Sequence, residues 1–235
     1  MGEMPGLRER KKLRTRRALT AAALRLFMEK GYEQTTVSEI AMAADVSTRT
    51  FFSYFASKEE VLFHTSREHI DRALRTVAER RAGESVIGLL TRAIDATFDA
   101  LADNPEIRRN VMVVNHLVMT VPSLQAHALL LLFDTQRELV EALRRACPDE
   151  LDLTQAAAVV GGVVGAAKLA GFIRANRGDT PEEVLAAGRE AAEMTLAALR
   201  AVPPPPSRPA RDDTEPGRPP GHGRRESGGD DPPGR

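Results

Sequence analysis

The chain has 235 residues, of which 42% are hydrophobic, and its 33 basic and 33 acidic residues give a formal net charge of zero. This length supports one substantial hydrophobic core, or a small module joined to a larger one. The neutral balance argues against a protein whose whole surface binds nucleic acid. The single cysteine, Cys147, excludes an internal disulfide and a zinc site built on paired cysteines, which favours a reducing, cytoplasmic setting. The beginning of the chain has no apolar signal segment.

Positive charge is concentrated near the start of the chain. One acid, Glu9, interrupts a basic run made of Arg8, Arg10, Lys11, Lys12, Arg14, Arg16 and Arg17. Such an arm can neutralise phosphates, and it is equally the pattern of a solvated, charged helix start.

The next segment has the apolar spacing of a helix. Its buried stripe recurs every three or four residues until Gly31 ends the helix, and it consists of Leu19, Ala22, Ala23, Leu26 and Phe27. Thr36 and Glu39 then form a capping box that starts a short helix, and Ser47 is the expected N-cap of a second one. Between them, Asp45 occupies a turn position where a left-handed backbone is often needed. Two short helices joined this way predict a helix-turn-helix at about 36–55.

The second short helix is the candidate for reading DNA. If Phe51 and Phe55 pack inward, its other side can face a major groove, with Arg49 as the best reader of base edges. Thr50 can contact a base edge or a thymine methyl, and Tyr54 can donate its hydroxyl to a phosphate. Lys58 and Thr36 can contact phosphates from the two ends of the helix-turn-helix. The alternative is a buried helical hairpin whose aromatic residues are only core.

The stretch from Leu19 to Leu62 closely resembles the DNA-binding domain of the TetR family. The motifs that carry the likeness are Leu26-Phe27, Gly31-Tyr32, Thr35-Thr36-Val37, Glu39-Ile40-Ala41, Ala44-Asp45-Val46-Ser47, Thr50-Phe51-Phe52, Tyr54-Phe55 and Ser57-Lys58-Glu59-Glu60. The resemblance implies an N-terminal three-helix domain followed by a larger helical domain that binds a small molecule and dimerises. It also implies DNA contacts, which together with Thr48 give the predicted set Thr36, Ser47, Thr48, Arg49, Thr50, Phe52, Tyr54 and Lys58.

Two residues depart from the family pattern. Asp45 replaces the usual glycine of the turn, and Phe52 lacks the hydroxyl of the commoner tyrosine, so it cannot supply that phosphate hydrogen bond. Within the family, the acyl-CoA-responsive and mycofactocin-type members look nearest.

The rest of the chain up to residue 202 is predicted to be helical, with no strand signal. Prolines and caps divide it into helices at 58–81, 84–102, 105–119, 122–146, 153–176 and 181–200. The last two are rich in Gly and Ala and can form a four-helix homodimer interface, or a hairpin buried within one chain. The apolar run from Ala156 to Ala167 is expected to be too short to span a bilayer.

A ligand cavity is expected among the helices of the larger domain. Its candidate residues are flexible methionines, aromatic residues and a few polar groups, namely Phe98, Met112, His116, Leu117, Met119, His127, Phe133, Lys168 and Phe172. Apolar residues at helical spacing are also ordinary core, and the two histidines have no evident third partner for a metal. We expect neither a metal nor a cofactor.

The sequence therefore predicts an all-α protein in three parts. These are a DNA-binding domain at 10–70, an effector-binding and dimerisation domain at 71–202, and a disordered tail at 203–235 rich in Pro, Gly, Arg and Asp. The predicted function is a cytoplasmic, homodimeric transcriptional regulator that binds double-stranded operator DNA and no membrane. We expect a repressor released by a small hydrophobic or amphipathic effector. A ligand-independent architectural DNA-binding protein is the alternative, and a helical enzyme is disfavoured because no nucleophile and base stand out.

Overall fold

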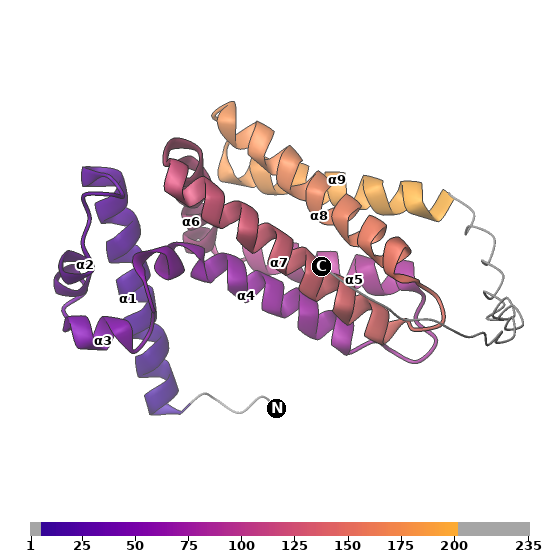
Figure 1. The fold of residues 1–235 in the computed structure, drawn as a ribbon, viewed down its shortest axis with the longest axis horizontal. Coiled ribbons are helices and arrows are strands. Elements are labelled where there is room, and N and C mark those ends of the chain that lie inside the picture. The colour runs from indigo at the N-terminus through magenta and orange to yellow at the C-terminus, as the bar shows by residue number, and fades with distance from the viewer. Residues whose placement is uncertain (1–5, 202–235) are drawn as a thin grey trace, which may run out of the picture. The chain divides into compact units, whose positions relative to one another are not determined.

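The computed structural model describes residues 6–201, which form nine α-helices and no strand (Figure 1). The helices are α1 Leu7–Lys30, α2 Val37–Ala43, α3 Thr48–Phe52, α4 Lys58–Ala78, α5 Val86–Ala102, α6 Pro105–Thr120, α7 Pro122–Ala146, α8 Leu153–Asn176 and α9 Pro181–Ala201. The all-α prediction is confirmed. The predicted tail at 203–235 lies outside the described residues.

Local sequence signals explain where most helices begin. Asn104 caps α6 through Oδ1, which accepts hydrogen bonds from the amides of Glu106 and Ile107, and α6 and α7 both begin on a proline. Asp152 and Gln155 form a reciprocal capping box at α8. A proline at the first helical position costs no hydrogen bond, because the first amides of a helix lack partners within it. The predicted bounds of α7 and α8 are confirmed.

The beginning of the chain differs from its sequence pattern. The apolar stripe starts at Leu19, but α1 already begins at Leu7, so the basic run forms its exposed first turns. Arg, Lys and Leu favour helices without requiring an apolar stripe. The basic residues are therefore the charged start of a helix, fixed in direction by the buried half of the same helix.

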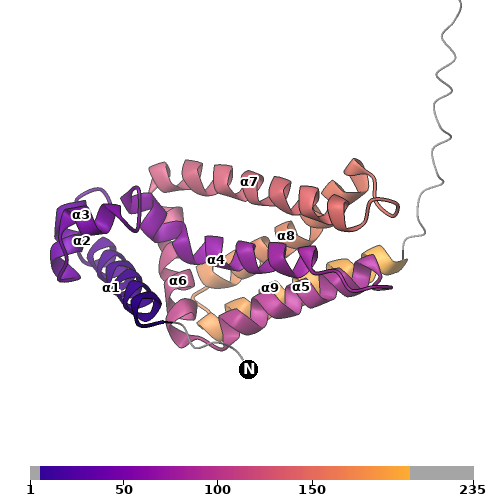
Figure 2. The same cartoon turned by 90° about the horizontal axis from the view of Figure 1, so that it is seen from below.

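Two clusters of buried residues hold the helices together. The first combines α1 to α4 with the end of α6 and the start of α7, through Val114, Leu117 and Leu124. The second combines α4, α5, α7, α8 and α9. Figure 2 shows the end of α6 beside α1 and α4. The small N-terminal domain thus shares its core with the α6–α7 corner.

Helices α8 and α9 pack closely along each other. A Cβ added to Gly188 would lie 3.2 Å from the carbonyl oxygen of Ala167, and one added to Gly162 would lie 3.3 Å from the methyl group of Thr195. Larger residues there would push the helices apart. On α9, Arg189 pairs with Asp95 and Asp99 of α5. Helices α8 and α9 therefore form a hairpin within one chain, but the hairpin is not buried throughout, since Leu169 and Ile173 of α8 are 59% and 43% exposed.

Among residues 6–201, α8 is by length and composition a helix that can cross a membrane. The bent pair α6 and α7 would add a second span if it counted as one. The run from Ala156 to Ala167 lies within this helix, so the shortness of the run does not by itself exclude a membrane span. Such helices also form cores and interfaces of globular proteins.

Candidate nucleic-acid interface

The helix-turn-helix rests on a core of aromatic side chains. Phe27 from α1, Phe51 from α3 and Phe55 after it are at most 1% exposed, and Ile40 of α2 is fully buried. The rings of Phe51 and Phe55 lie 5.8 Å apart between centroids. Because α2 and α3 are too short to be stable alone, this packing on α1 is what orders them.

The turn between α2 and α3 has the backbone that its sequence predicts. Asp45 has φ = 55°, and it is the one non-glycine residue with positive φ in the described chain. The amide of Val46 donates to the carbonyl of Ala41 at 3.0 Å, which closes the turn. Asp tolerates a left-handed backbone better than most residues, but at a cost that glycine avoids.

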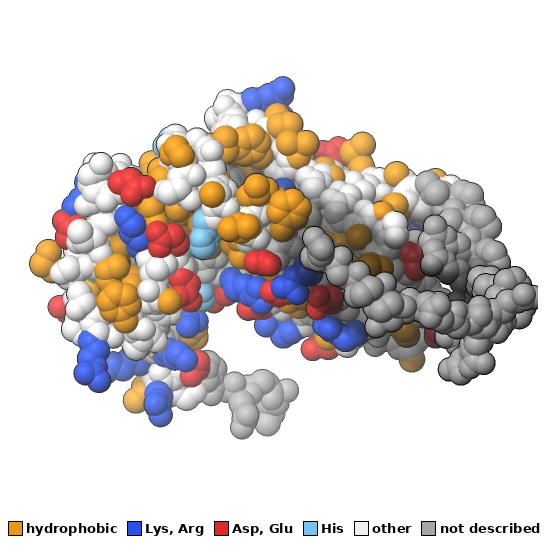
Figure 3. Space-filling model, viewed as in Figure 1, with side chains coloured by type: hydrophobic (Ala, Val, Ile, Leu, Met, Phe, Trp, Pro, Cys, Tyr) orange, Lys and Arg blue, Asp and Glu red, His pale blue; other side chains and the backbone are white. Residues whose placement is uncertain are grey.

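Helix α3 presents its outer side to solvent. Thr48 and Arg49 are exposed, and Phe52 is 58% exposed, although its neighbour Phe51 is fully buried. Ser47 caps the helix, since its Oγ accepts from the amide of Thr50 at 3.1 Å. The alternative of a hairpin buried throughout is therefore wrong for this side of α3. Figure 3 shows basic side chains gathered beside α3 and over the start of α1.

The start of α2 is fixed by a full capping box. The amide and hydroxyl of Thr36 donate to Glu39, and the amide of Glu39 donates to Thr36 Oγ1. Hydrogen bonds from Lys30 and then from Thr36 lower the pKa of Glu39 to about 2. The Thr36 side chain stays exposed, so it can still approach a phosphate while it holds α2.

Lys58 has a structural contact that the sequence did not reveal. Its Nζ donates to the carbonyl of Tyr32 at 2.9 Å and lies 4.1 Å from the centroid of that ring. The Tyr32 hydroxyl donates to Glu59, and burial together with this carboxylate raises the pKa of Tyr32. Lys58 and Glu59 thus fasten the α1–α2 turn to the start of α4. No periodic pattern signals these contacts, because the residues are far apart in sequence.

The predicted DNA-contacting residues share one region of the molecule. Thr36 and Ser47 precede α2 and α3, Tyr54 follows α3, Lys58 begins α4, and the other four lie on α3. The exposed residues are Thr36, Ser47, Thr48, Arg49 and Phe52, and the half-buried ones are Thr50, Tyr54 and Lys58. Two exposed neighbours were not predicted, Ser38 and the 76% exposed Met42, both on α2. Both lie on the first of the two short helices, which is why a search for basic and hydroxyl groups on the second one passes over them.

The nine predicted ligand residues are dispersed. Leu117 belongs to the cluster under the helix-turn-helix and Phe98 packs against the other cluster. His127 stacks on Phe63, with ring centroids 4.9 Å apart. Met119 and Phe133 are 40% and 62% exposed. Of the others, Met112 and Phe172 are half-buried, His116 is exposed, and the charge of Lys168 on α8 acts on His69 of α4. Their role as one ligand site stays a prediction.

Comparison with known proteins finds the same domain. Residues 19–65 match the family described as bacterial regulatory proteins, tetR family. The HTH-type transcriptional regulator TcmR of Streptomyces glaucescens is 47% identical over 100 residues, which cover 42% of this chain and 44% of TcmR. Matches to the curated relatives span from 23% to 52% of the relative's length.

Solved structures extend the likeness to the whole described chain at the level of the fold. A TetR-family transcriptional regulator from Syntrophomonas wolfei has a TM-score of 0.56 at 17% identity, covering 82% of this chain and 100% of that one. The fatty acid degradation regulator FadR from Bacillus halodurans has a TM-score of 0.53 at 20% identity, covering 84% and 99%. The likeness to a particular subgroup stays a prediction. The likeness to the tetR family of bacterial regulatory proteins thus rests on residues 19–65 of this chain, and beyond them it is a likeness of fold.

Proposed function

We propose that this chain is a homodimeric, sequence-specific DNA-binding transcriptional regulator, a repressor that a small hydrophobic or amphipathic effector releases from its operator. The observation that carries the proposal is the outer side of α3, exposed and held on a buried aromatic core. The alternative of a ligand-independent architectural DNA-binding protein shares this interface but needs no effector.

Arg49 is the residue to which we assign base reading. It is exposed in the first turn of α3, where a helix laid in a major groove brings its side chains to base edges. A guanidinium donates two hydrogen bonds to guanine, which distinguishes that base from the others. The exposed basic start of α1 supplies phosphate contacts, which position the protein without reading sequence.

Dimerisation through α8 and α9 is supported by an apolar face that one chain leaves uncovered. Ala157, Gly161, Gly165, Leu169 and Ile173 recur every four residues and therefore lie on one side of α8. Space is open around Gly161 and Gly165, whereas Leu169 and Ile173 are 59% and 43% exposed. The 66% exposed Met194 adds to this surface from α9. Two copies joined here would bury it in a four-helix interface.

The α6–α7 corner provides a route from an effector to the DNA-binding helices. Leu117 and Leu124 pack into the core beneath α1 and α4. Ser123 donates to Glu33 in the α1–α2 turn at 2.9 Å. A ligand that moves α6 therefore also moves the support of the helix-turn-helix. It releases DNA only if it binds the DNA-free arrangement more tightly.

The relatives support the regulatory part of this proposal. Those matched in sequence are named as transcriptional regulators rather than as enzymes. A further structure of this fold, with a TM-score of 0.53 and 22% identity, is a complex of SmeT with triclosan. A small-molecule effector for this chain is inferred by analogy with that complex.

The direct test is selection of bound duplexes from random DNA, followed by fluorescence anisotropy on the selected and a scrambled duplex. We expect Arg49→Ala to weaken selected-site binding by about 1–3 kcal/mol, roughly 5- to 150-fold, and to relax preference at one base position. Arg25→Ala is the matched control, since Arg25 is exposed on α1 and pairs with Glu29. Equal preference in wild type and Arg49→Ala would remove Arg49 as a reader.

A further inference from the structure

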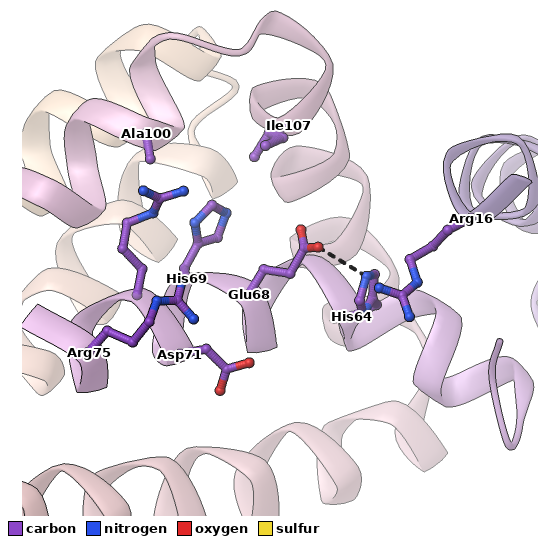
Figure 4. A pocket seen from close by; sticks show the side chains of 9 residues that line it. Arg16, His64, Glu68, His69, Asp71, Arg75, Ala100 and Ile107 are labelled. Atoms are coloured by element: carbon purple, nitrogen blue, oxygen red, sulfur yellow. Dashed lines mark ion pairs between the residues drawn. The ribbon is translucent and has the colours of Figure 1, made fainter. Parts of the chain in front are cut away.

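A cavity of about 370 Å³ is lined by residues of α1, α4, α5 and α6, none of which is a predicted ligand residue (Figure 4). Arg16 reaches into it from α1 toward His64. His69 and Arg75 line it from α4, and Ala100 and Ile107 give it an apolar wall. The volume is sufficient for part of a small metabolite.

Three side chains around this cavity have buried polar atoms without hydrogen-bond partners. The atoms are Nε of Arg16, Nε2 of His64 and both ring nitrogens of His69. Buried donors and acceptors in proteins are almost always paired, because leaving them unpaired costs free energy. Four such atoms on one cavity indicate that this lining is suited to a polar group from outside the chain.

The charges on the lining favour a negative group. Of its two carboxylates, Asp71 pairs with Arg67 at 3.0 Å. Glu68 lies 3.3 Å from Nε2 of His64, and this contact, helped by the charge of Arg16, lowers the pKa of the Glu68 carboxyl. By contrast, no described carboxylate lies within 4.0 Å of the basic groups of Arg16, Arg72 or Arg75. Positive charge therefore exceeds what the lining itself neutralises.

The environment of His69 also favours binding of an anion. Burial lowers its pKa to about 4; Glu68 opposes this shift, and the charges of Arg72 and Lys168 add to it. At neutral pH the ring is uncharged and holds one N–H donor. A neutral donor beside unpaired guanidinium groups can bind an anion without bringing a second buried charge.

We propose that this cavity binds the carboxylate or phosphate group of a small anionic molecule, with Arg16 and His69 as its buried donors. Arginine suits both groups, because its fork donates paired hydrogen bonds to two oxygens. Ala100 and Ile107 leave room for a short apolar portion. Since Arg16 lies on α1 and His69 on α4, a bound anion would join the basic helix to the helix that leads into the larger domain. This binding does not depend on the proposed DNA recognition.

The test measures anion binding by the full chain without DNA. Inorganic phosphate and octanoate are titrated separately by isothermal calorimetry at constant ionic strength set with chloride, with octanol as the uncharged control. We expect saturable binding of at least one anion, and a dissociation constant raised tenfold or more in both Arg16→Gln and His69→Gln. Binding of phosphate alone would identify a phosphate ligand, and binding of octanoate a carboxylate.

Matched variants keep the result interpretable. Arg25→Gln changes an exposed residue of α1 outside the cavity and should leave the dissociation constant unchanged. If Arg16→Gln fails to fold, as judged by circular dichroism, Arg75→Gln replaces it, because Arg75 is exposed and lines the same cavity. No saturable anion binding, equal binding by the cavity variants, or octanol binding as tight as octanoate overturns the proposal.

Discussion

The N-terminal domain and the helices α8 and α9 differ in how far their large apolar side chains are buried. Beneath α3 the rings of Phe27, Phe51 and Phe55 are at most 1% exposed, and the large apolar side chains that reach solvent beside them are single residues, Phe52 and Met42. On α8 and α9 large side chains stay open, including Leu169 at 59% and Met194 at 66%. The N-terminal domain therefore completes its core within one chain, whereas the C-terminal helices leave a surface that a second chain can complete.

The largest expected effect concerns the buried core beneath α3. Phe51→Ala removes a fully buried ring beneath α3 and should lower the free energy of unfolding by about 3–5 kcal/mol. Phe52→Ala, one residue along the same helix, should change it by about 0.5 kcal/mol or less. Urea denaturation followed by circular dichroism measures both. Similar losses for the two variants would mean that α3 does not have one buried and one open side.

The next largest effect concerns the exposed apolar face of α8. Leu169→Glu places a charge on the uncovered face of α8, which a dimer would have to bury, and should weaken dimerisation by about 2–4 kcal/mol. Sedimentation equilibrium over a range of concentrations measures the dissociation constant. Leu7→Glu, at an 80% exposed position on α1, should leave it unchanged. A dimer as tight in Leu169→Glu as in wild type would place the interface elsewhere.

A smaller effect, of opposite sign, sharpens the description of the turn. Asp45→Gly should stabilise the chain by about 0.5–1 kcal/mol, because glycine adopts φ = 55° without the cost that a side chain carries there. The greater freedom of glycine in the unfolded chain offsets part of the gain. Thermal unfolding measures the difference. A clear loss of stability would show that the Asp45 side chain contributes more than its backbone strain costs.

The smallest effect concerns the pair that links α4 to α7. Arg67 donates two hydrogen bonds to Glu138, at 3.0 and 2.8 Å, and thereby lowers the pKa of Glu138. A lowered carboxyl pKa contributes stability above the unfolded-state value, and this contribution is lost as the pH falls through the folded value. Glu138→Gln should cost about 0.2–1 kcal/mol at pH 7 and flatten the acid side of the stability profile. A profile identical to wild type would assign acid sensitivity to other groups.

The N-terminal domain was also the part of the chain that the sequence predicted better. Thr36, Ser47 and Asp45 act through their own backbone neighbourhood, so local sequence was sufficient to place the caps and the left-handed turn. The prolines likewise located the starts of α6 and α7. The extent of α1 was not predictable from its apolar stripe, because a charged helix start has no stripe.

Contacts between residues far apart in the chain could not be predicted from the sequence. Lys58 contacts Tyr32 across two helix boundaries, and Arg16 and His69 meet at one cavity from separate helices. The predicted ligand residues lie in different parts of the fold for the same reason, because spacing along a helix identifies a buried side but not the helix that covers it. His127 against Phe63 is an example.

The most direct test of whether α3 reads DNA is to map the bases that the chain contacts on its selected duplex. Methylation protection should reveal two groups of guanines shielded in the major groove, with centres about one helical turn apart, because each subunit of a dimer inserts one α3. Arg49→Ala should lose protection at one guanine of each half-site and retain the rest. Protection confined to the minor groove, or none on any selected duplex, would contradict the claim that α3 reads DNA.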